Sequence, residues 1–377
     1  MPDVAPFVRL PLPIEALPTS IQRFCNTAGP TAARVMAAKG LVPVKGHEQV
    51  LMLAQLAADE ATEVRDAAKK TLTGLPENVR RPACTADLPN GVLDMLADLL
   101  AHDLECQVLI VVNDATHHTT IERLARGASE QLSERIAVNE ARLLISPTII
   151  EALYKNRNTR MSTADRLIEL AARNNLDLQG IPAYKDHVEA LQGQLIPEPS
   201  DEPLPQDQVF NAALLEDDES DDGEIFEEDK VTGETKLRTK FKPLSMQIAE
   251  MGKAEKIRLA MVGNKAARAL LVRDISKQIA YAAISSPGMT VQEACEIAKA
   301  RDVTEEILRY IANKKEWLKS SEVKHNLVFN PKCPVGLSMK FLGFMRLDEL
   351  RNLARSRNVP AQLRGLAAQW VARKAKE

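Results

Sequence analysis

Apolar residues recur along most of the chain at the three- and four-residue spacing of amphipathic helices, and almost nowhere at the alternating spacing of strands. The apolar face of one predicted helix consists of Val50, Leu53, Leu56 and Ala57. That of the next consists of Val64, Ala67, Ala68 and Leu72. Gly74 and Pro76 are expected to end this second helix. The pattern predicts an all-α fold of short, consecutive helices.

Three helix starts are marked by a Ser or Thr that is followed three residues later by an acidic residue. In such a capping box the two side chains satisfy backbone N–H groups that the first helical turn leaves without partners. The three pairs are Thr119 with Glu122, Ser162 with Asp165, and Thr290 with Glu293. Each pair predicts the N-terminus of a helix.

The C-terminal part of the chain contains an internal repeat. Residues 279–290 match residues 323–334 at an offset of 44, with Pro287 aligned on Pro331 and three apolar positions in register. A second motif at 298–303 recurs with an offset of 56. Proline cannot continue a helix and disfavours the helical conformation of the residue before it, so each helix ends at a fixed place. Because helix pairs of this size cannot bury their apolar faces alone, we expect them to stack into a solenoid.

Several segments resemble known helical repeats. The Asp…Val-Arg…Ala…Leu pattern of residues 59–72 is similar to the core of a HEAT repeat, and the segments around Pro287 and Pro331 resemble the Asn-Pro-containing repeats called leucine-rich repeat variants. The C-terminal part is also similar to an uncharacterised group of bacterial helical-repeat proteins, through residues 305–317 and 356–360. These resemblances imply a non-catalytic scaffold with an extended binding surface.

The formal net charge of −3 hides three regions of different sign. Residues 1–197 carry −4, residues 198–229 carry −14 without a single Lys or Arg, and residues 230–377 carry +15. The acidic region follows a proline-rich stretch and has too few apolar residues to offset the entropy of ordering. We therefore expect a flexible linker here, with short docking points at a few apolar positions. These are Val209, Phe210, Leu214, Leu215, Ile225 and Phe226.

The predicted architecture is two HEAT-like α-solenoid lobes joined by a disordered acidic linker. Its parts are an extended N-terminal segment at 1–19, a helical-repeat lobe at 20–195, an acidic flexible linker at 196–242 and a basic helical-repeat lobe at 243–377.

Composition limits the classes of protein that the chain can belong to. No apolar run approaches the roughly 18 to 20 residues that cross a bilayer, so no transmembrane segment is expected. The N-terminus is proline-rich and lacks a basic segment followed by an apolar core, which argues against a secretory signal. The five Cys are odd in number and scattered, with no Cys-x-x-Cys motif, which favours reduced thiols and a cytoplasmic location.

Chemistry-bearing motifs are absent from the sequence. It lacks the glycine-rich phosphate loop, the dinucleotide fingerprint, the nucleophile elbow and the His-Glu-x-x-His zinc motif. We therefore expect no enzymatic activity, no catalytic residues, no cofactor and no metal. Two alternatives are disfavoured. One is a metal site formed by His102 and Cys106 with His117 or Asp114, and the other is a nucleophilic thiol at Cys84 or Cys106.

The sharpest functional signal is the basic C-terminal lobe. The candidate binding residues are Lys314, Lys315, Trp317, Lys319, Arg346, Arg351, Arg355, Arg357 and Arg364. Nearby aromatic residues at helical spacing are expected to be core rather than base-stacking residues. These are Tyr281, Tyr310, Phe329, Phe341 and Phe344.

The favoured function is a protein-binding scaffold or adaptor. The alternative is a nucleic-acid-binding module that uses the basic lobe, with the acidic linker masking that lobe.

Overall fold

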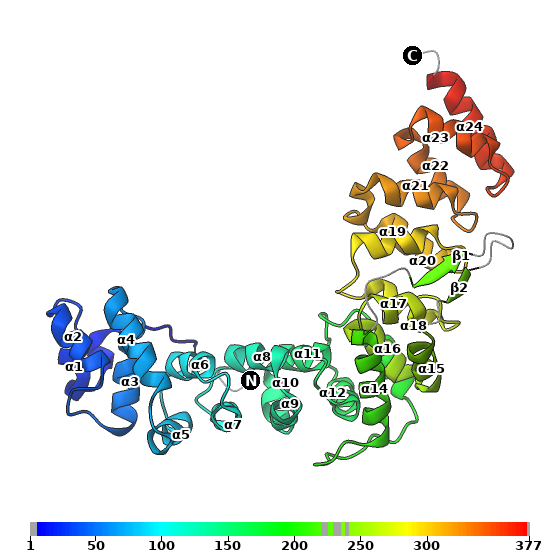
Figure 1. The fold of residues 1–377 in the computed structure, drawn as a ribbon. Helices are drawn as coiled ribbons and strands as arrows, with labels where there is room; N and C mark the ends of the chain where they lie inside the picture. The colour runs from blue at the N-terminus through cyan, green and yellow to red at the C-terminus, as the bar shows by residue number, and fades with distance from the viewer. Residues whose placement is uncertain (1–5, 220–224, 229–234, 238–240, 375–377) are drawn as a thin grey trace. The chain divides into compact units, whose positions relative to one another are not determined.

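The computed structural model describes residues 6–219, 225–228, 235–237 and 241–374. The chain divides into two compact units, Met1–Leu178 and Gln179–Glu377. In each unit short helices follow one another along the chain (Figure 1). The described part is helical except for loops and one two-stranded antiparallel hairpin, which confirms the all-α prediction.

The first unit consists of one 3₁₀ turn and twelve α-helices among its described residues. They are η1 (Ile14–Ala16), α1 (Thr19–Cys25), α2 (Thr31–Ala38), α3 (Gly46–Leu56), α4 (Thr62–Thr73), α5 (Glu77–Thr85), α6 (Asn90–Leu99), α7 (Leu104–Val112), α8 (His118–Gly127), α9 (Glu130–Ala137), α10 (Glu140–Ile145), α11 (Pro147–Lys155) and α12 (Met161–Arg173).

The second unit contains the remaining helices and the hairpin. They are α13 (Tyr184–Leu191), α14 (Pro205–Glu219), β1 (Phe226–Glu228), β2 (Thr235–Leu237), α15 (Lys242–Glu250), α16 (Lys253–Val262), α17 (Lys265–Leu271), α18 (Lys277–Ser285), α19 (Val291–Lys299), α20 (Glu305–Asn313), η3 (Trp317–Lys319), α21 (Ser321–Phe329), α22 (Val335–Phe341), η4 (Leu342–Phe344), α23 (Leu347–Arg355) and α24 (Ala361–Lys374).

The helices stack in two rows. Each helix packs on the second helix after it in the chain, so that alternate helices form a row. In the first unit α1, α3, α5, α7 and α9 form one row, and α2, α4, α6 and α8 form the other. In the second unit α16 packs on α18, α17 on α19, and α19 on α21. Single helices of this length cannot bury both flanks alone, so the stacked rows supply the continuous core that the repeat predicted.

The predicted apolar faces are buried where the sequence placed them. Val50, Leu53 and Leu56 on α3 are at most 1% exposed, as are Val64 and Leu72 on α4. Residue 74 caps α4 as predicted. Fully burying a side chain of this size contributes about 1.5 to 3 kcal/mol, so these faces hold α3 and α4 in the stack.

Of the three predicted capping boxes, one forms. Thr290 and Glu293 cap α19 reciprocally. Helix α8 begins at His118 with His117 as its cap, so Thr119 lies inside the helix. Helix α12 begins at Met161, which places Ser162 inside it as well. The caps of these two helices are His117 and Arg160, so both starts were predicted two residues late.

The aligned prolines mark equivalent places in the second unit. Pro287 follows α18 and Pro331 follows α21, each one residue after the helix cap. The aligned apolar residues of both helices are buried. They are Ile279, Ala283, Ile284, Val323, Leu327 and Val328.

Asparagine side chains join neighbouring helices of a row at their C-terminal ends. Asn113, Asn156 and Asn330 directly follow α7, α11 and α21. The Nδ2 group of Asn330 donates to the carbonyl oxygens of Ala298 and Ala300 at the end of α19, both at 2.8 Å. Asn113 and Asn156 do the same at the ends of α5 and α8. The last carbonyl groups of a helix have no partner within it, so these amides satisfy them.

A buried ion pair connects α17 to α19. The guanidinium of Arg268 donates twice to the carboxylate of Glu293, at 3.0 and 2.7 Å, and once to the carbonyl oxygen of Gly263 at 2.6 Å. Arg268 and Glu293 are each 7% exposed. Removing one partner of such a pair leaves a buried charge uncompensated, which costs about 3 to 5 kcal/mol.

Part of the segment predicted as a flexible linker, 196–242, is helical. Helix α14 lies within it and packs on α15 and α16. Phe210 is fully buried, and the guanidinium carbon of Arg258 lies 4.9 Å from its ring centroid. Leu214 and Ile225 are also buried, and Arg273 lies 3.8 Å from the ring centroid of Phe226. Four of the six predicted docking points therefore make contact within the second unit, where apolar burial and cation–π contacts oppose the entropy of ordering.

The other two docking points are less engaged, because Val209 is half-buried and Leu215 is 66% exposed. The rest of the predicted linker includes residues 220–224, 229–234 and 238–240, which lie outside the described residues. The predicted masking of the basic lobe involves this part of the chain.

The division between the units also differs from the predicted lobe boundary. The first unit ends at Leu178, whereas the predicted first lobe ran to residue 195. Helix α13 packs on α16 and so belongs to the second unit. The composition changes only after residue 197, so a count of charges gives no sign of a division at Leu178.

We predict that Asn330→Asp destabilises the second unit by about 3 kcal/mol, because a carboxylate replaces the amide donors and faces two carbonyl oxygens. The measurement is urea unfolding followed by tryptophan fluorescence, since both Trp residues lie in this unit. Asn352→Asp, on the exposed side of α23, is the matched control and should shift the midpoint little. Equal midpoints for the two variants would contradict the capping role.

Candidate binding surface of the second unit

Cations in the first part of the second unit are matched by carboxylates on the next helix pair. Besides the pair of Arg268 with Glu293, three more ion pairs join this part of the unit to carboxylates 29 to 31 residues further along the chain. They are Lys265 with Glu296 at 3.0 Å, Arg273 with Asp302 at 2.8 Å, and Lys277 with Glu306 at 2.7 Å. These pairs join α17 and the turn after it to α19 and the turn after it, and they join α18 to α20. The paired charges therefore stabilise the stacking of the helices.

The charge balance changes at the end of the unit. Between Lys324 and Arg373 the chain has nine Lys or Arg residues and only two acidic ones, Asp348 and Glu349. We call these nine the terminal cationic region. Its members are Lys324, Lys332, Lys340, Arg346, Arg351, Arg355, Arg357, Arg364 and Arg373. Among the described residues, Arg351 alone of the nine forms an ion pair, with Asp348 at 3.1 Å.

The nine predicted binding residues fall into two groups along the chain. Lys314, Lys315, Trp317 and Lys319 lie in and beside η3. The five arginines lie on or next to α23 and α24, within the terminal cationic region. All the lysines and four of the arginines are exposed, and Arg364 is half-buried. Trp317 is only 5% exposed, so it supports the surface from beneath instead of facing solvent.

An aromatic cluster surrounds Lys314. Tyr281 on α18 meets Tyr310 on α20 edge-on, with ring centroids 5.6 Å apart, and Tyr310 lies 5.9 Å from Trp317. The ammonium of Lys314 lies 5.9 Å from the ring centroids of both Tyr310 and Trp317. Partial burial, reinforced by Tyr310 and Asp186, raises the pKa of Tyr281. Tyr281 is still 43% exposed, so the cluster reaches the surface.

Further aromatic contacts lie beside residues of the terminal cationic region. Phe344 is 67% exposed, with the ammonium of Lys324 4.5 Å from its ring centroid. His325 stacks on Phe329 at 4.4 Å between centroids and contacts Glu349 at 3.3 Å. The prediction that the five aromatic residues are core is thus correct for Phe341, which is 7% exposed, and wrong for Phe344 and Tyr281.

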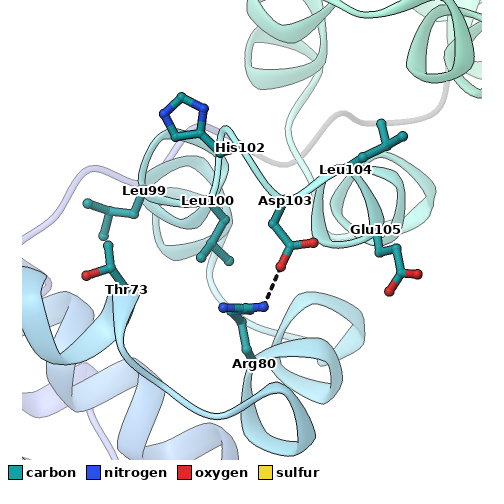
Figure 2. Close-up of a pocket in the computed structure, with 8 residues that line it drawn as sticks. All are labelled: Thr73, Arg80, Leu99, Leu100, His102, Asp103, Leu104 and Glu105. Atoms are coloured by element: carbon teal, nitrogen blue, oxygen red, sulfur yellow. Dashed lines mark ion pairs between the residues drawn. The ribbon is translucent and has the colours of Figure 1, made fainter.

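In the first unit, an open pocket of about 470 Å³ lies beside the turn between α6 and α7. Figure 2 shows Arg80 and Asp103, two of its lining residues, pointing toward each other. Their side chains pair at 2.6 Å. The carboxylate of Asp103 also accepts the N–H of Cys106 and so caps α7. This hydrogen bond, together with Arg80 and Arg81, lowers the pKa of Asp103. The charged groups of the pocket are thereby engaged with one another and with a helix end.

The structure does not bring His102 and Cys106 together in the way that a metal site would need. His102 lies on the turn before α7 and points away from Arg80 and Asp103 (Figure 2), whereas Cys106 is buried inside α7. The two residues therefore do not share a helical face. Within the described ranges, no group of three His, Cys, Asp or Glu side chains is arranged to hold a metal ion.

The thiols are buried as well. All five Cys are free and at most 7% exposed. Burial raises the pKa of each thiol, to about 12 for Cys25 and about 11 for Cys295. The thiolate is the nucleophilic form, so a raised pKa and burial both oppose reaction.

Several structurally important polar residues were missed by sequence reasoning. Gln55 and Asn90 bind the backbone of the N-terminal segment, and Asn113 and Asn156 cap neighbouring helices. A comparison of the residues that follow each predicted helix would have found Asn113, Asn156 and Asn330, because all three occupy the same place. No sequence signal distinguishes Gln55 from an ordinary helix residue.

The fold belongs to the class of α-solenoids, in which helices stack on one another, and its second unit carries the terminal cationic region. No protein-family model matches the chain, and no curated protein or solved structure is significantly similar to it. In the part of the chain that the structure describes, none of the helices has the length and apolar character needed to cross a membrane.

We predict that the native protein does not react with dithionitrobenzoate at pH 7 to 8, because its thiols are buried and protonated. In denaturant, all five should react. The measurement is the absorbance of released thionitrobenzoate with and without urea. Rapid labelling of one native thiol would show that a Cys is exposed and ionised, contrary to this account.

Proposed function

We propose that this protein is a non-catalytic scaffold or adaptor of HEAT-like helical repeats, which binds an acidic segment of a protein partner at its terminal cationic region. The observation that carries the proposal is the contrast between two parts of the second unit. From α17 to α20, cations pair with carboxylates of the next helix pair, whereas the terminal cationic region has one ion pair among the described residues.

A surface with uncompensated positive charge attracts an oppositely charged partner and speeds its encounter. Exposed arginines add planar, multidonor recognition of carboxylates. Arg346, Arg355 and Arg357 are exposed and have no ion pair among the described residues, so their donors face solvent. These three residues are expected to contact the partner, and Phe344 adds exposed apolar area beside them in the sequence.

The scaffold role also fits the polar groups within the stacked helices. The amides of Asn156 and Asn330 bind helix carbonyls, and the carboxylate of Glu293 binds Arg268. These groups have structural partners and need no substrate. A cytoplasmic location is supported by the five free thiols, which a reducing compartment preserves.

We predict that replacing Arg346, Arg355 and Arg357 by Gln weakens binding to an acidic partner about tenfold. Exposed charges of this kind contribute about 0.5 kcal/mol each, and the three together correspond to roughly one order of magnitude in Kd. A first measurement is fluorescence polarisation with a labelled 20-residue polyglutamate probe. Nuclease-treated extract then supplies candidate protein partners, whose retention on wild-type and variant chains is compared by mass spectrometry.

The matched control replaces Lys277 and Arg309 by Gln. These cations are exposed, but they pair with Glu306 and Glu305. The control should bind the probe and the partners as the wild type does. Equal losses in both variants would mean that net charge alone governs binding, and unchanged binding in the triple variant would remove the terminal cationic region as the site.

A nucleic-acid-binding module is the second candidate, and the exposed aromatic side chains favour it. Phe344 lies under the ammonium of Lys324, and Tyr281 is exposed near Lys314. Cations that follow a backbone and aromatic faces that stack bases are the two elements of single-strand recognition.

For this candidate we predict that the triple Gln variant lowers the salt dependence of binding to a 20-nucleotide single strand. Losing three phosphate contacts should reduce the slope of log K against log salt by about 2. Phe344→Ala should weaken the same binding by about 1 to 3 kcal/mol, since it removes a stacking face, and should leave polyglutamate binding nearly unchanged. Single strands that bind no more tightly than polyglutamate, with no effect of Phe344→Ala, would decide for the protein scaffold.

A further inference from the structure

The first unit contains a non-helical segment, bent at Leu10 and Pro11, whose backbone is bound by side-chain amides. Residues 6–13 form no helix or strand and precede η1. Asn90, at the start of α6, accepts the N–H of Val8 at 2.8 Å and donates to the carbonyl oxygen of Pro6 at 3.0 Å. Gln55 on α3 accepts the N–H of Leu12 at 2.7 Å and donates to its carbonyl oxygen at 2.8 Å.

All four hydrogen bonds are made with backbone groups of the segment and none with its side chains. Gln55 pairs with Leu12 through both N–H and C=O, as a neighbouring strand residue would. Gln55 and Asn90 are 6% and 8% exposed, so their amides are buried and need hydrogen-bond partners. Leaving such a group unsatisfied costs about 1 to 3 kcal/mol. The two amides therefore hold a non-helical backbone segment against α3 and α6.

Close approach of the segment depends on Gly91. A Cβ atom added there would lie 2.0 Å from the carbonyl oxygen of Val8 and 3.2 Å from its carbonyl carbon. No side chain fits at this position, so the surface of α6 is shaped to accept a peptide backbone.

The side chains of the segment divide into buried and exposed positions. Leu12 is 7% exposed, Leu10 packs against the core of the first unit, and the ring of Phe7 meets that of His117 edge-on at 5.3 Å. Val8 is 39% exposed, and Arg9 is also exposed. Counted from Pro6, the surface thus contacts apolar side chains at the second, fifth and seventh positions of the segment.

We propose that the surface formed by Gln55, Asn90, Gly91 and His117 is a binding site for a non-helical peptide with this apolar spacing in a partner protein, and that residues 6–12 occupy it in cis. A tethered occupant acts at millimolar effective concentration, so the partner peptide must displace it. The site lies in the first unit and does not involve the terminal cationic region. Its test is therefore independent of the proposed function.

The experiment uses the full chain with Val8→Pro and Leu12→Pro. Both substitutions remove the N–H groups that donate to Asn90 and Gln55, so the tethered segment is released. The probe is a fluorescein-labelled peptide of residues 5–14, and its matched control carries the same two prolines. The wild-type peptide should bind the released chain at least tenfold more tightly than it binds the wild-type chain. The proline peptide should bind the released chain at least tenfold more weakly than the wild-type peptide does.

Gly91→Ala provides a second variant, which blocks the site for tethered and added peptide alike. Combined with the two proline substitutions, it should abolish binding of the wild-type peptide. In the otherwise wild-type chain it should expel the segment and speed tryptic cleavage after Arg9 several-fold. Gly127→Ala is the matched control, because a Cβ there meets nothing within 4 Å, and it should change neither readout.

Helicity of each variant is checked by circular dichroism. The proposal is overturned if the released chain keeps its helicity and fails to bind the wild-type peptide, or binds the proline peptide equally well. It is also overturned if both the proline and the Gly91→Ala variants lose their helical signal, because the segment is then an integral part of the fold and not a displaceable ligand.

Discussion

The stack of helices depends on how the carbonyl groups at the helix ends are satisfied. Helices of about ten residues have nearly half of their carbonyls without intrahelical partners, and in a stack these ends are buried. Side chains from a helix further along the chain supply the missing donors. Asn330 does this for α19, and Arg142 donates to the carbonyl oxygens of Val111 and Asn113 at the end of α7. Each such contact fixes the spacing and rotation of two neighbouring helices, which apolar packing alone leaves adjustable.

The sequence predicted what depends on local pattern. The faces of α3 and α4, the cap of α19 and the prolines after α18 and α21 follow from periodicity and from the chemistry of helix ends. The sequence did not predict burial that depends on a distant segment of the chain. Composition averaged over 198–229 predicts a flexible chain, yet Phe210 finds an apolar site against Arg258 that no local pattern reveals. Helical spacing also placed Phe344 in the core, although it is exposed near the end of the chain.

The candidate sites show the same division. The excess of cations after residue 324 is visible in the sequence, because a count of charges needs no coordinates. Among the described residues, only Arg351 of these cations forms an ion pair, whereas those of α17 and α18 are paired. This contrast emerges only from the structure, since the partners of the paired cations lie 25 to 31 residues away. The sequence pattern did not reveal that Gln55 and Asn90 bind backbone groups, because the segment they bind lies more than 40 residues away in the chain. Both surfaces are proposed recognition sites, each on the stacked helices of its own unit.

The most direct test of a scaffold that binds through its terminal cationic region is lysine footprinting of the full chain with and without its captured partner, by acetylation and mass spectrometry. The account predicts that Lys324, Lys332 and Lys340 become protected in the complex, while Lys265 and Lys277, which are held in ion pairs, react at the same rate in both states. Protection of Lys265 and Lys277 with no change at the three terminal lysines would contradict it.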